Sequence, residues 1–137
     1  RRNTPFSFEN CLVAQTNDKV VAVLLSYEMK EDDDYVVEDP VLKPFWLLEE
    51  PRSLYIAGVA VDPAWRQQGI ASVLMKMTES KCRQKHLQKM SLIVFEANTI
   101  AYDFYLRLGF TEVMRKPVVP HPLIKFTGDA LLLVKNL

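Results

Sequence analysis

The sequence predicts a single domain of the α/β class, and the order of its apolar segments leads to this class. An apolar run at residues 54–61 is followed by a segment with helical spacing and then by a second apolar run at residues 92–95. This order predicts two parallel strands joined through a helix by a right-handed crossover. Strand patterns also precede and follow this unit, and 137 residues can bury one core but not two. Residues 1–137 are therefore expected to form one domain.

The chain opens with the pattern of a β-hairpin. Residues 11–15 and 20–27 are rich in Val, Leu and Ala, and the turn residues Thr16-Asn17-Asp18-Lys19 lie between them. From residue 28 to residue 53 an acidic run and several prolines break the strand pattern. Residues 28–53 are therefore interpreted as an insertion or loop.

The central unit carries its own local signals. Gly58 lies within the apolar run of residues 54–61, which predicts a bulge or a close backbone approach at that point. The run ends at Asp62-Pro63, and Gly69 opens a helix of about five turns. Its buried stripe is expected to contain Ala71, Leu74, Met75, Thr78 and Cys82.

The last third of the chain predicts one short helix and two closing strands. Asn98 is a good N-cap, and Gly109 is a good left-handed stop for the helix between them. Residues 110–115 and 130–134 have strand patterns and are joined by a proline-rich loop. The helix should bury one face, formed by Ala101, Phe104, Tyr105 and Leu108.

Composition and charge exclude several classes of function. Lys plus Arg and Asp plus Glu both number 17, so no net field attracts nucleic acid or an anionic membrane. The longest apolar run is far below the roughly 20 residues that span a bilayer, and we expect a cytoplasmic protein without membrane or nucleic-acid partners. Cys11 and Cys82 lie in no metal-binding motif and are interpreted as two buried, free thiols, so no metal is expected.

The segment from Val59 to Ser72 carries the chemistry. A buried strand turns there into a helix whose first turn contains Gly69 and Ala71. Free amides and the positive end of the helix dipole favour an anion at such a terminus, and a pyrophosphate is the natural candidate. The alternative is that the small residues only allow tight packing of helix on strand. The sequence contains neither a P-loop motif nor a three-glycine dinucleotide fingerprint.

Two motifs resemble those of the GNAT superfamily of N-acetyltransferases. Arg66-x-x-Gly69-x-Ala71 matches the family pattern Arg/Gln-x-x-Gly-x-Gly/Ala, and it stands directly after the central strand. Asn98-x-x-Ala101-x-x-Phe104-Tyr105-x-x-x-Gly109-Phe110 is similar to the second family motif. The resemblance implies a mixed, mainly antiparallel sheet, in which a parallel βαβ unit splays to form an acetyl-CoA slot. It covers the chain from about Cys11 onward, and it also implies that residues 1–137 lack the family's N-terminal strand and helices.

The same resemblance implies roles for particular residues. Main-chain groups of the central strand would pair with the pantetheine arm of the cofactor, and the amides that follow would hold the pyrophosphate. Asn98 would contact the arm or act only as an N-cap, and Tyr105 would be the general acid or only a core aromatic residue. The implied cofactor-binding residues are Val59, Ala60, Val61, Arg66, Gln67, Gln68, Gly69, Ile70, Ala71, Ser72, Asn98 and Tyr105.

The general base is not assigned by these motifs. Glu96 and His121 are candidates by residue type, although Glu96 is also a plausible solvent-exposed carboxylate and His121 a loop residue between two prolines. Some members of the family carry a glutamate five residues before the motif asparagine, and Ile93 occupies that position here.

The resemblance implies direct acetyl transfer from acetyl-CoA to a primary amine of a small molecule or a protein. No covalent intermediate and no metal is needed. Two alternatives remain open: a non-catalytic acyl-CoA-binding regulatory module, and an interaction domain whose glycine turn is only architectural. A homodimer is also left open.

Overall fold

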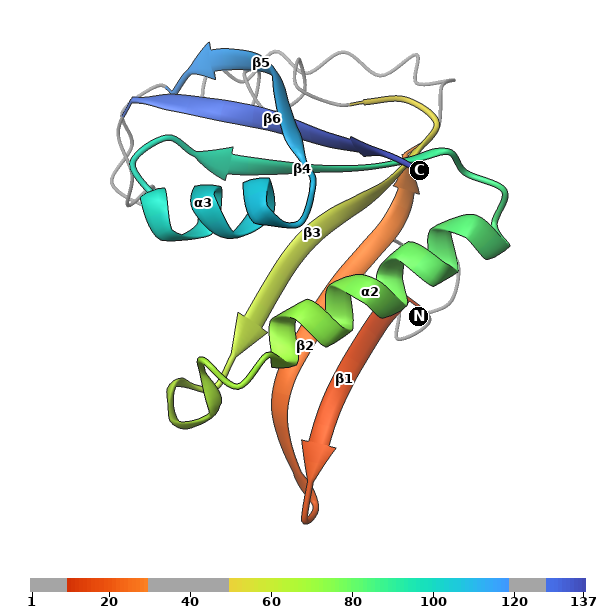
Figure 1. The fold of residues 1–137 in the computed structure, drawn as a ribbon, viewed down its shortest axis with the longest axis vertical. Helices are drawn as coiled ribbons and strands as arrows, with labels where there is room; N and C mark the ends of the chain where they lie inside the picture. The colour runs from red at the N-terminus through yellow and green to blue at the C-terminus, as the bar shows by residue number, and fades with distance from the viewer. Residues whose placement is uncertain (1–9, 30–49, 119–127) are drawn as a thin grey trace.

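A computed structural model describes residues 10–29, 50–118 and 128–137. Within these ranges the chain forms one mixed six-stranded sheet in the order β1-β2-β3-β4-β6-β5, accompanied by helices α2 and α3 and a short 3-10 turn (Figure 1). The elements are β1 (Cys11–Thr16), β2 (Lys19–Met29), β3 (Ser53–Val61), η2 (Pro63–Trp65), α2 (Ile70–Gln84), β4 (Lys89–Phe95), α3 (Thr99–Arg107), β5 (Thr111–Pro117) and β6 (Asp129–Asn136).

The predicted hairpin and closing strands are confirmed. β1 pairs antiparallel with β2, and β2 pairs antiparallel with β3. On the other side of the sheet, β6 pairs antiparallel with both β4 and β5. Among the strands of the described ranges, only β3 and β4 pair in parallel, as expected for two strands joined through α2. The mixed, mainly antiparallel sheet that the motifs implied is therefore present.

The two parallel strands separate partway along their length. Their pairing ends at Ile56 and Leu92, although both strands continue, and Figure 1 shows them diverging. At the same level, the register between β2 and β3 shifts, because Leu25 pairs with Gly58 whereas Ser26 pairs with Ile56. The extra residue is Ala57, so the bulge that Gly58 predicted lies beside that glycine. The bulge bends β3 away from β4 and opens the sheet.

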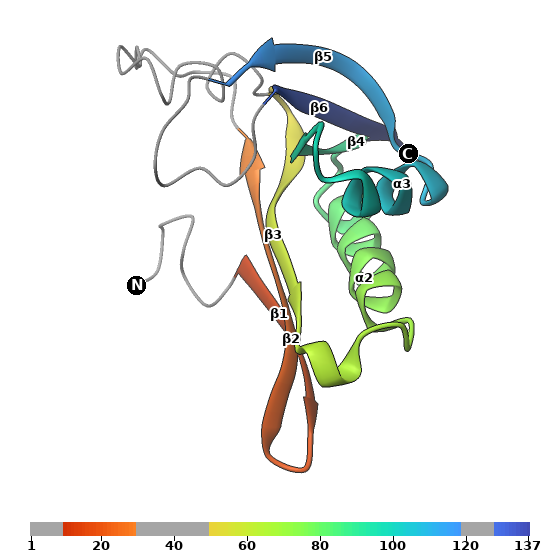
Figure 2. The ribbon, with the colours of Figure 1, turned by 90° about the vertical axis from the view of Figure 1, so that its left-hand side faces the viewer.

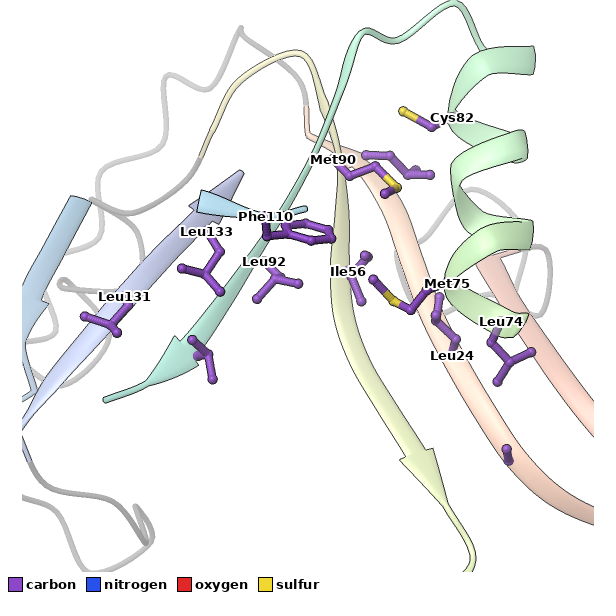
Figure 3. Close-up of a cluster of buried hydrophobic side chains, with 13 residues drawn as sticks. Leu24, Ile56, Leu74, Met75, Cys82, Met90, Leu92, Phe110, Leu131 and Leu133 are labelled. Carbon is purple, nitrogen blue, oxygen red and sulfur yellow. The ribbon is translucent and has the colours of Figure 1, made fainter. Parts of the chain in front are cut away.

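Both helices cover the same face of the sheet (Figure 2). Their apolar sides pack with inward-facing residues of the strands in one cluster, in which Phe110 lies near the centre (Figure 3). Buried members of this cluster include Leu24, Leu54, Ile56, Leu74, Met75, Cys82, Met90, Leu92, Phe110, Leu131 and Leu133. Neither helix of the described part is long and apolar enough to cross a membrane.

Two details differ from expectation, and two sequence features lie outside the described residues. Cys82 is buried but Cys11 is exposed, so the expectation of two buried thiols was wrong for Cys11. Cys11 lies on an edge strand, where alternate side chains point away from the core. Helix α2 has 15 residues, about four turns instead of five. The acidic run of residues 31–34 and the candidate base His121 lie outside the described residues.

Candidate functional site

The edge of β3 that faces β4 is open beyond Ile56. The Asp62 amide donates a hydrogen bond to the Val21 carbonyl of β2 at 2.8 Å. Because main-chain groups alternate along an antiparallel strand, those of Ala60 also face β2, whereas those of Val59 and Val61 face the gap toward β4. The strand thus offers an added extended chain the main-chain groups of Val59 and the amide of Val61, because the Val61 carbonyl accepts a hydrogen bond from Arg66 and the backbone of Ala60 pairs with β2.

The turn that follows β3 is held at both ends by side chains. The Asp62 carboxylate accepts a hydrogen bond from the Ala64 amide at 2.9 Å and pairs with Lys19 of the hairpin at 3.3 Å. The hydrogen bond from Ala64, together with Lys19, lowers the pKa of Asp62. The Arg66 Nε donates to the Val61 carbonyl at 3.2 Å. These contacts fix the path of the chain from the open strand edge to the start of α2.

The start of α2 has the geometry of an anion site. Gly69 is the N-cap residue in the left-handed conformation at φ 78°, and no side chain caps the helix. The first helical hydrogen bond runs from the Val73 amide to the Gly69 carbonyl at 3.1 Å, so the preceding amides have no intrahelical acceptor. A Cβ atom added at Gly69 would meet nothing within 4 Å beyond its chain neighbours. The helix start therefore has both unsatisfied donors and open space in front of them.

Gln67 adds a feature that the motif did not predict. It adopts φ 64°, a left-handed conformation that is unfavourable for a residue with a side chain. Such local strain concentrates at functional sites, where the surrounding structure imposes it. Arg66, Gln67 and Gln68 are all exposed, so this turn is accessible to a ligand.

Helix α3 begins and ends where its sequence predicted. The Asn98 side chain accepts a hydrogen bond from the Ala101 amide at 3.4 Å, so its N-cap role is confirmed, and Gly109 has φ 100°. The contact of Asn98 with a cofactor is untested by this geometry and stays a prediction.

Tyr105 is a largely enclosed aromatic residue on the sheet-facing side of α3. Its ring packs edge-on against Phe104 and Phe110, with centroid separations of 5.3 and 5.9 Å. Burial raises the pKa of Tyr105, so the phenol is neutral at physiological pH. Its hydroxyl has no hydrogen-bond partner among the described residues. The hydroxyl is not among the buried polar atoms without a partner in the described residues, so it is accessible to solvent and to a ligand.

Glu96 comes directly after β4, but its carboxylate is already engaged. Arg115 of β5 lies 2.6 Å from Glu96, 2.9 Å from Glu112 and 3.3 Å from Asp129. The sequence did not predict this cluster, because its members are brought together only by the pairing of β4, β5 and β6. Ile93, which replaces the family glutamate, packs against the apolar residues Ala130, Leu132 and Val134. In the described ranges no group of three or more His, Cys, Asp or Glu side chains is arranged to hold a metal ion.

The fold and both motifs agree with a comparison of the sequence to known families. The model of the acetyltransferase (GNAT) family matches residues 2–110. The chain therefore belongs to the GNAT family, as its motifs predicted.

Particular relatives support this assignment. The chain is 29% identical over 118 residues to GCN5-related N-acetyltransferase 10, chloroplastic, of Arabidopsis thaliana, covering 85% of this chain and 45% of the relative. It is 28% identical over 107 residues to N-alpha-acetyltransferase 30 of Dictyostelium discoideum, covering 78% and 49%. Its fold is similar to that of a GNAT family acetyltransferase from Elizabethkingia anophelis with acetyl-CoA bound, with a TM-score of 0.67 and 18% identity over 93% of this chain and 75% of that one. The chain spans about half the length of the curated relatives it matches.

Proposed function

We propose that this chain transfers an acetyl group from acetyl-CoA to a primary amine. One observation carries the proposal: an open strand edge at Val59 and Val61 leads through a fixed turn into the uncapped start of α2. An extended amide-containing arm can pair with the strand edge, while a diphosphate accepts hydrogen bonds from the helix amides. Acetyl-CoA combines both groups in one molecule. Arg66, the amides of residues 67–72 and Asn98 would hold it.

The reaction would be a direct transfer. The neutral amine nitrogen attacks the thioester carbonyl, a C–N bond forms, and the C–S bond breaks when the tetrahedral intermediate collapses. The amine proton leaves to a base or to water. Tyr105 would donate its phenolic proton to the departing thiolate, which is the role that its raised pKa and unpartnered hydroxyl support.

The acceptor is proposed to be an amino group of a protein or peptide, or of a small molecule. The name of the Dictyostelium relative indicates α-amino acetylation, which supports a protein N-terminus as one acceptor. Alkyl amines have a pKa near 10.4 and must lose a proton before they attack, whereas α-amino groups, with a pKa of about 8, need less assistance. An α-amino acceptor therefore fits a site whose base is unassigned.

The decisive experiment measures thiol release from acetyl-CoA in the presence of a panel of amines and N-terminal peptides. We expect release that depends on both the enzyme and one class of acceptor, with mass spectrometry locating the acetyl group on nitrogen. Calorimetry with coenzyme A is run beside it. Binding without transfer to any acceptor would favour the non-catalytic regulatory module, which the engaged Glu96 carboxylate and the apolar Ile93 keep as the second candidate. Absence of binding would leave only the interaction domain.

Glu96→Gln is expected to lower kcat/KM by less than about threefold. The Glu96 carboxylate is held 2.6 Å from Arg115, so it is engaged by that side chain and is not free to contact an acceptor amine. Steady-state kinetics at several pH values would check this. Glu112→Gln is the matched control, since it removes another carboxylate from the same arginine. A loss of about a hundredfold or more for Glu96→Gln alone would instead assign the base to Glu96.

A further inference from the structure

Asp62 lies where the open strand edge of β3 meets the turn that leads to α2, and each of its polar groups has a partner. Its main-chain amide donates to Val21 at 2.8 Å, and its carbonyl accepts from the Trp65 amide at 2.8 Å. One carboxylate oxygen accepts from the Ala64 amide at 2.9 Å, and the other pairs with Lys19 at 3.3 Å. Lys19 belongs to the β1–β2 hairpin, which extends past the end of β3 (Figure 1). A residue distant in the chain thus supplies the countercharge of Asp62.

Arg66 carries a second positive charge close to the same carboxylate. Its Nε donates to the Val61 carbonyl at 3.2 Å, and its terminal nitrogens make no hydrogen bond or ion pair with any described residue. The hydrogen bond from the Ala64 amide lowers the pKa of Asp62 most, Lys19 comes next, and the charge of Arg66 also contributes. Arg66 therefore interacts electrostatically with Asp62, while Lys19 forms the ion pair. The Arg66 guanidinium stays unpaired at an exposed turn.

The two cations compete for one carboxylate. An Asp62 that is already paired with Lys19 attracts Arg66 less strongly, because the opposite charges of the pair largely cancel at the position of Arg66. Without Lys19, Arg66 is the other cation of the described chain that acts on Asp62. A phosphate gains most from a guanidinium without another partner, since arginine can contact two of its oxygens at once. The partner chosen by Asp62 therefore affects how well Arg66 can bind an anion.

We propose that Lys19 is a positioning residue of the cofactor site, which pairs with Asp62 and so leaves Arg66 free to bind the diphosphate of acetyl-CoA. The inference rests on the proposed function, because it requires Arg66 to contact that diphosphate. Lys19 itself does not contact the cofactor in this role and acts only through the other two side chains. It belongs to neither of the two sequence motifs, so the hairpin contributes to the site from outside them.

Calorimetric affinity for coenzyme A at low ionic strength tests this role, because salt screens exposed charges. Lys19→Gln should weaken binding about fivefold, the upper end of what one exposed ion pair contributes, since Asp62 then attracts Arg66. Lys19→Arg keeps the charge and should stay within about twofold of wild type. Lys85→Gln removes the same charge from the far end of α2 and should have no effect. The Lys19 side chain is 62% exposed, so the thermal midpoint should stay unchanged.

Two double variants separate this role from a purely structural one. Asp62→Asn keeps an oxygen for the Ala64 amide and removes the negative charge, so Lys19→Gln/Asp62→Asn should regain the wild-type affinity. Arg66→Gln introduces the other residue that the family pattern allows, and in this background Lys19→Gln should cause no further loss. If Lys19 only tied the hairpin to the turn, both double variants would keep the loss.

The outcomes distinguish this inference from the proposed function. Wild-type affinity in Lys19→Gln would overturn the inference, and so would a loss that persists in either double variant. Both results leave the proposed function standing, because the wild type still binds coenzyme A. If the wild type binds no coenzyme A, the proposed function fails and the inference fails with it.

Discussion

Gly69→Val is expected to weaken coenzyme A binding by about a hundredfold while the protein stays folded. A Cβ atom added at this position would meet nothing within 4 Å beyond its chain neighbours, so a valine side chain would project into the open space where the diphosphate must approach. Losing two amide hydrogen bonds to a charged group, each at the lower end of about 1.5–3 kcal/mol, accounts for a change of this size. The left-handed backbone at φ 78° adds a strain of roughly 1–2 kcal/mol, which a domain of ordinary stability tolerates.

The measurement is calorimetric affinity for coenzyme A, with thermal unfolding measured in parallel. Gly69→Ala and Gly109→Ala form a matched pair, because both place a methyl group on a left-handed residue. At Gly109 the new methyl group would meet only the flexible stem of Lys135, at 3.3 Å. We expect similar losses of stability in both and a loss of affinity only at Gly69. Wild-type affinity in Gly69→Val would mean that the start of α2 does not hold the diphosphate.

Tyr105→Phe is expected to lower kcat by about 10²–10⁴-fold, with the cofactor affinity changed less than twofold. The phenol would donate a proton to the leaving thiolate. The negative charge of this thiolate develops only during the reaction, so loss of the phenol hydroxyl should lower kcat and leave cofactor binding nearly unchanged. Its hydroxyl has no partner among the described residues, so the substitution breaks no internal hydrogen bond there and should leave stability unchanged. Single-turnover kinetics would separate the chemical step from binding and product release.

The pH dependence gives an independent readout of the same residue. Burial raises the pKa of Tyr105 above its ordinary value of 10.0, so the donor form is complete at neutral pH and is lost only as the pH rises through that raised value. The wild type should show this alkaline decline in kcat, and Tyr105→Phe should not. Tyr102→Phe is the control, because Tyr102 lies on the same helix as Tyr105 but its hydroxyl already donates a hydrogen bond to Glu112 of β5 at 3.4 Å. Equal turnover of Tyr105→Phe and wild type across this range would remove Tyr105 from the mechanism.

Short-range sequence signals were enough to predict the helix starts that frame the site. A glycine before an apolar stripe predicted the start of α2 at Gly69, and an asparagine before another stripe predicted the start of α3 at Asn98. The Asp62-Pro63 pair carries a further start signal, because an acceptor side chain followed by proline is typical of the first residues of a helical turn, and Asp62 does cap η2. These features depend on residues within one or two turns of each other.

Short-range signals could not predict features that depend on which strands are neighbours in the sheet. Residues 54–61 are one apolar run in the sequence, and only the pairing with β2 decides which edge of the strand each main-chain group faces. The main-chain groups of Ala60 face β2 and therefore point away from the gap toward β4. Cys11 was wrongly expected to be buried because an apolar context does not reveal that its strand lies at a sheet edge. The engagement of Glu96 by Arg115 likewise appears only when three strands pair.

The sequence by itself determined the α/β class, the βαβ unit, the GNAT membership and the glycine turn at the start of α2, since each is encoded in short-range spacing and residue type. Only the tertiary structure decided where β3 and β4 part, which main-chain groups face the gap, and which charges are neutralised. Those outcomes arise from contacts between residues distant in the chain, as when Lys19 pairs with Asp62 or Arg115 pairs with Glu96. Long-range pairing, burial and charge compensation leave no local pattern, because each depends on the partner as much as on the residue itself.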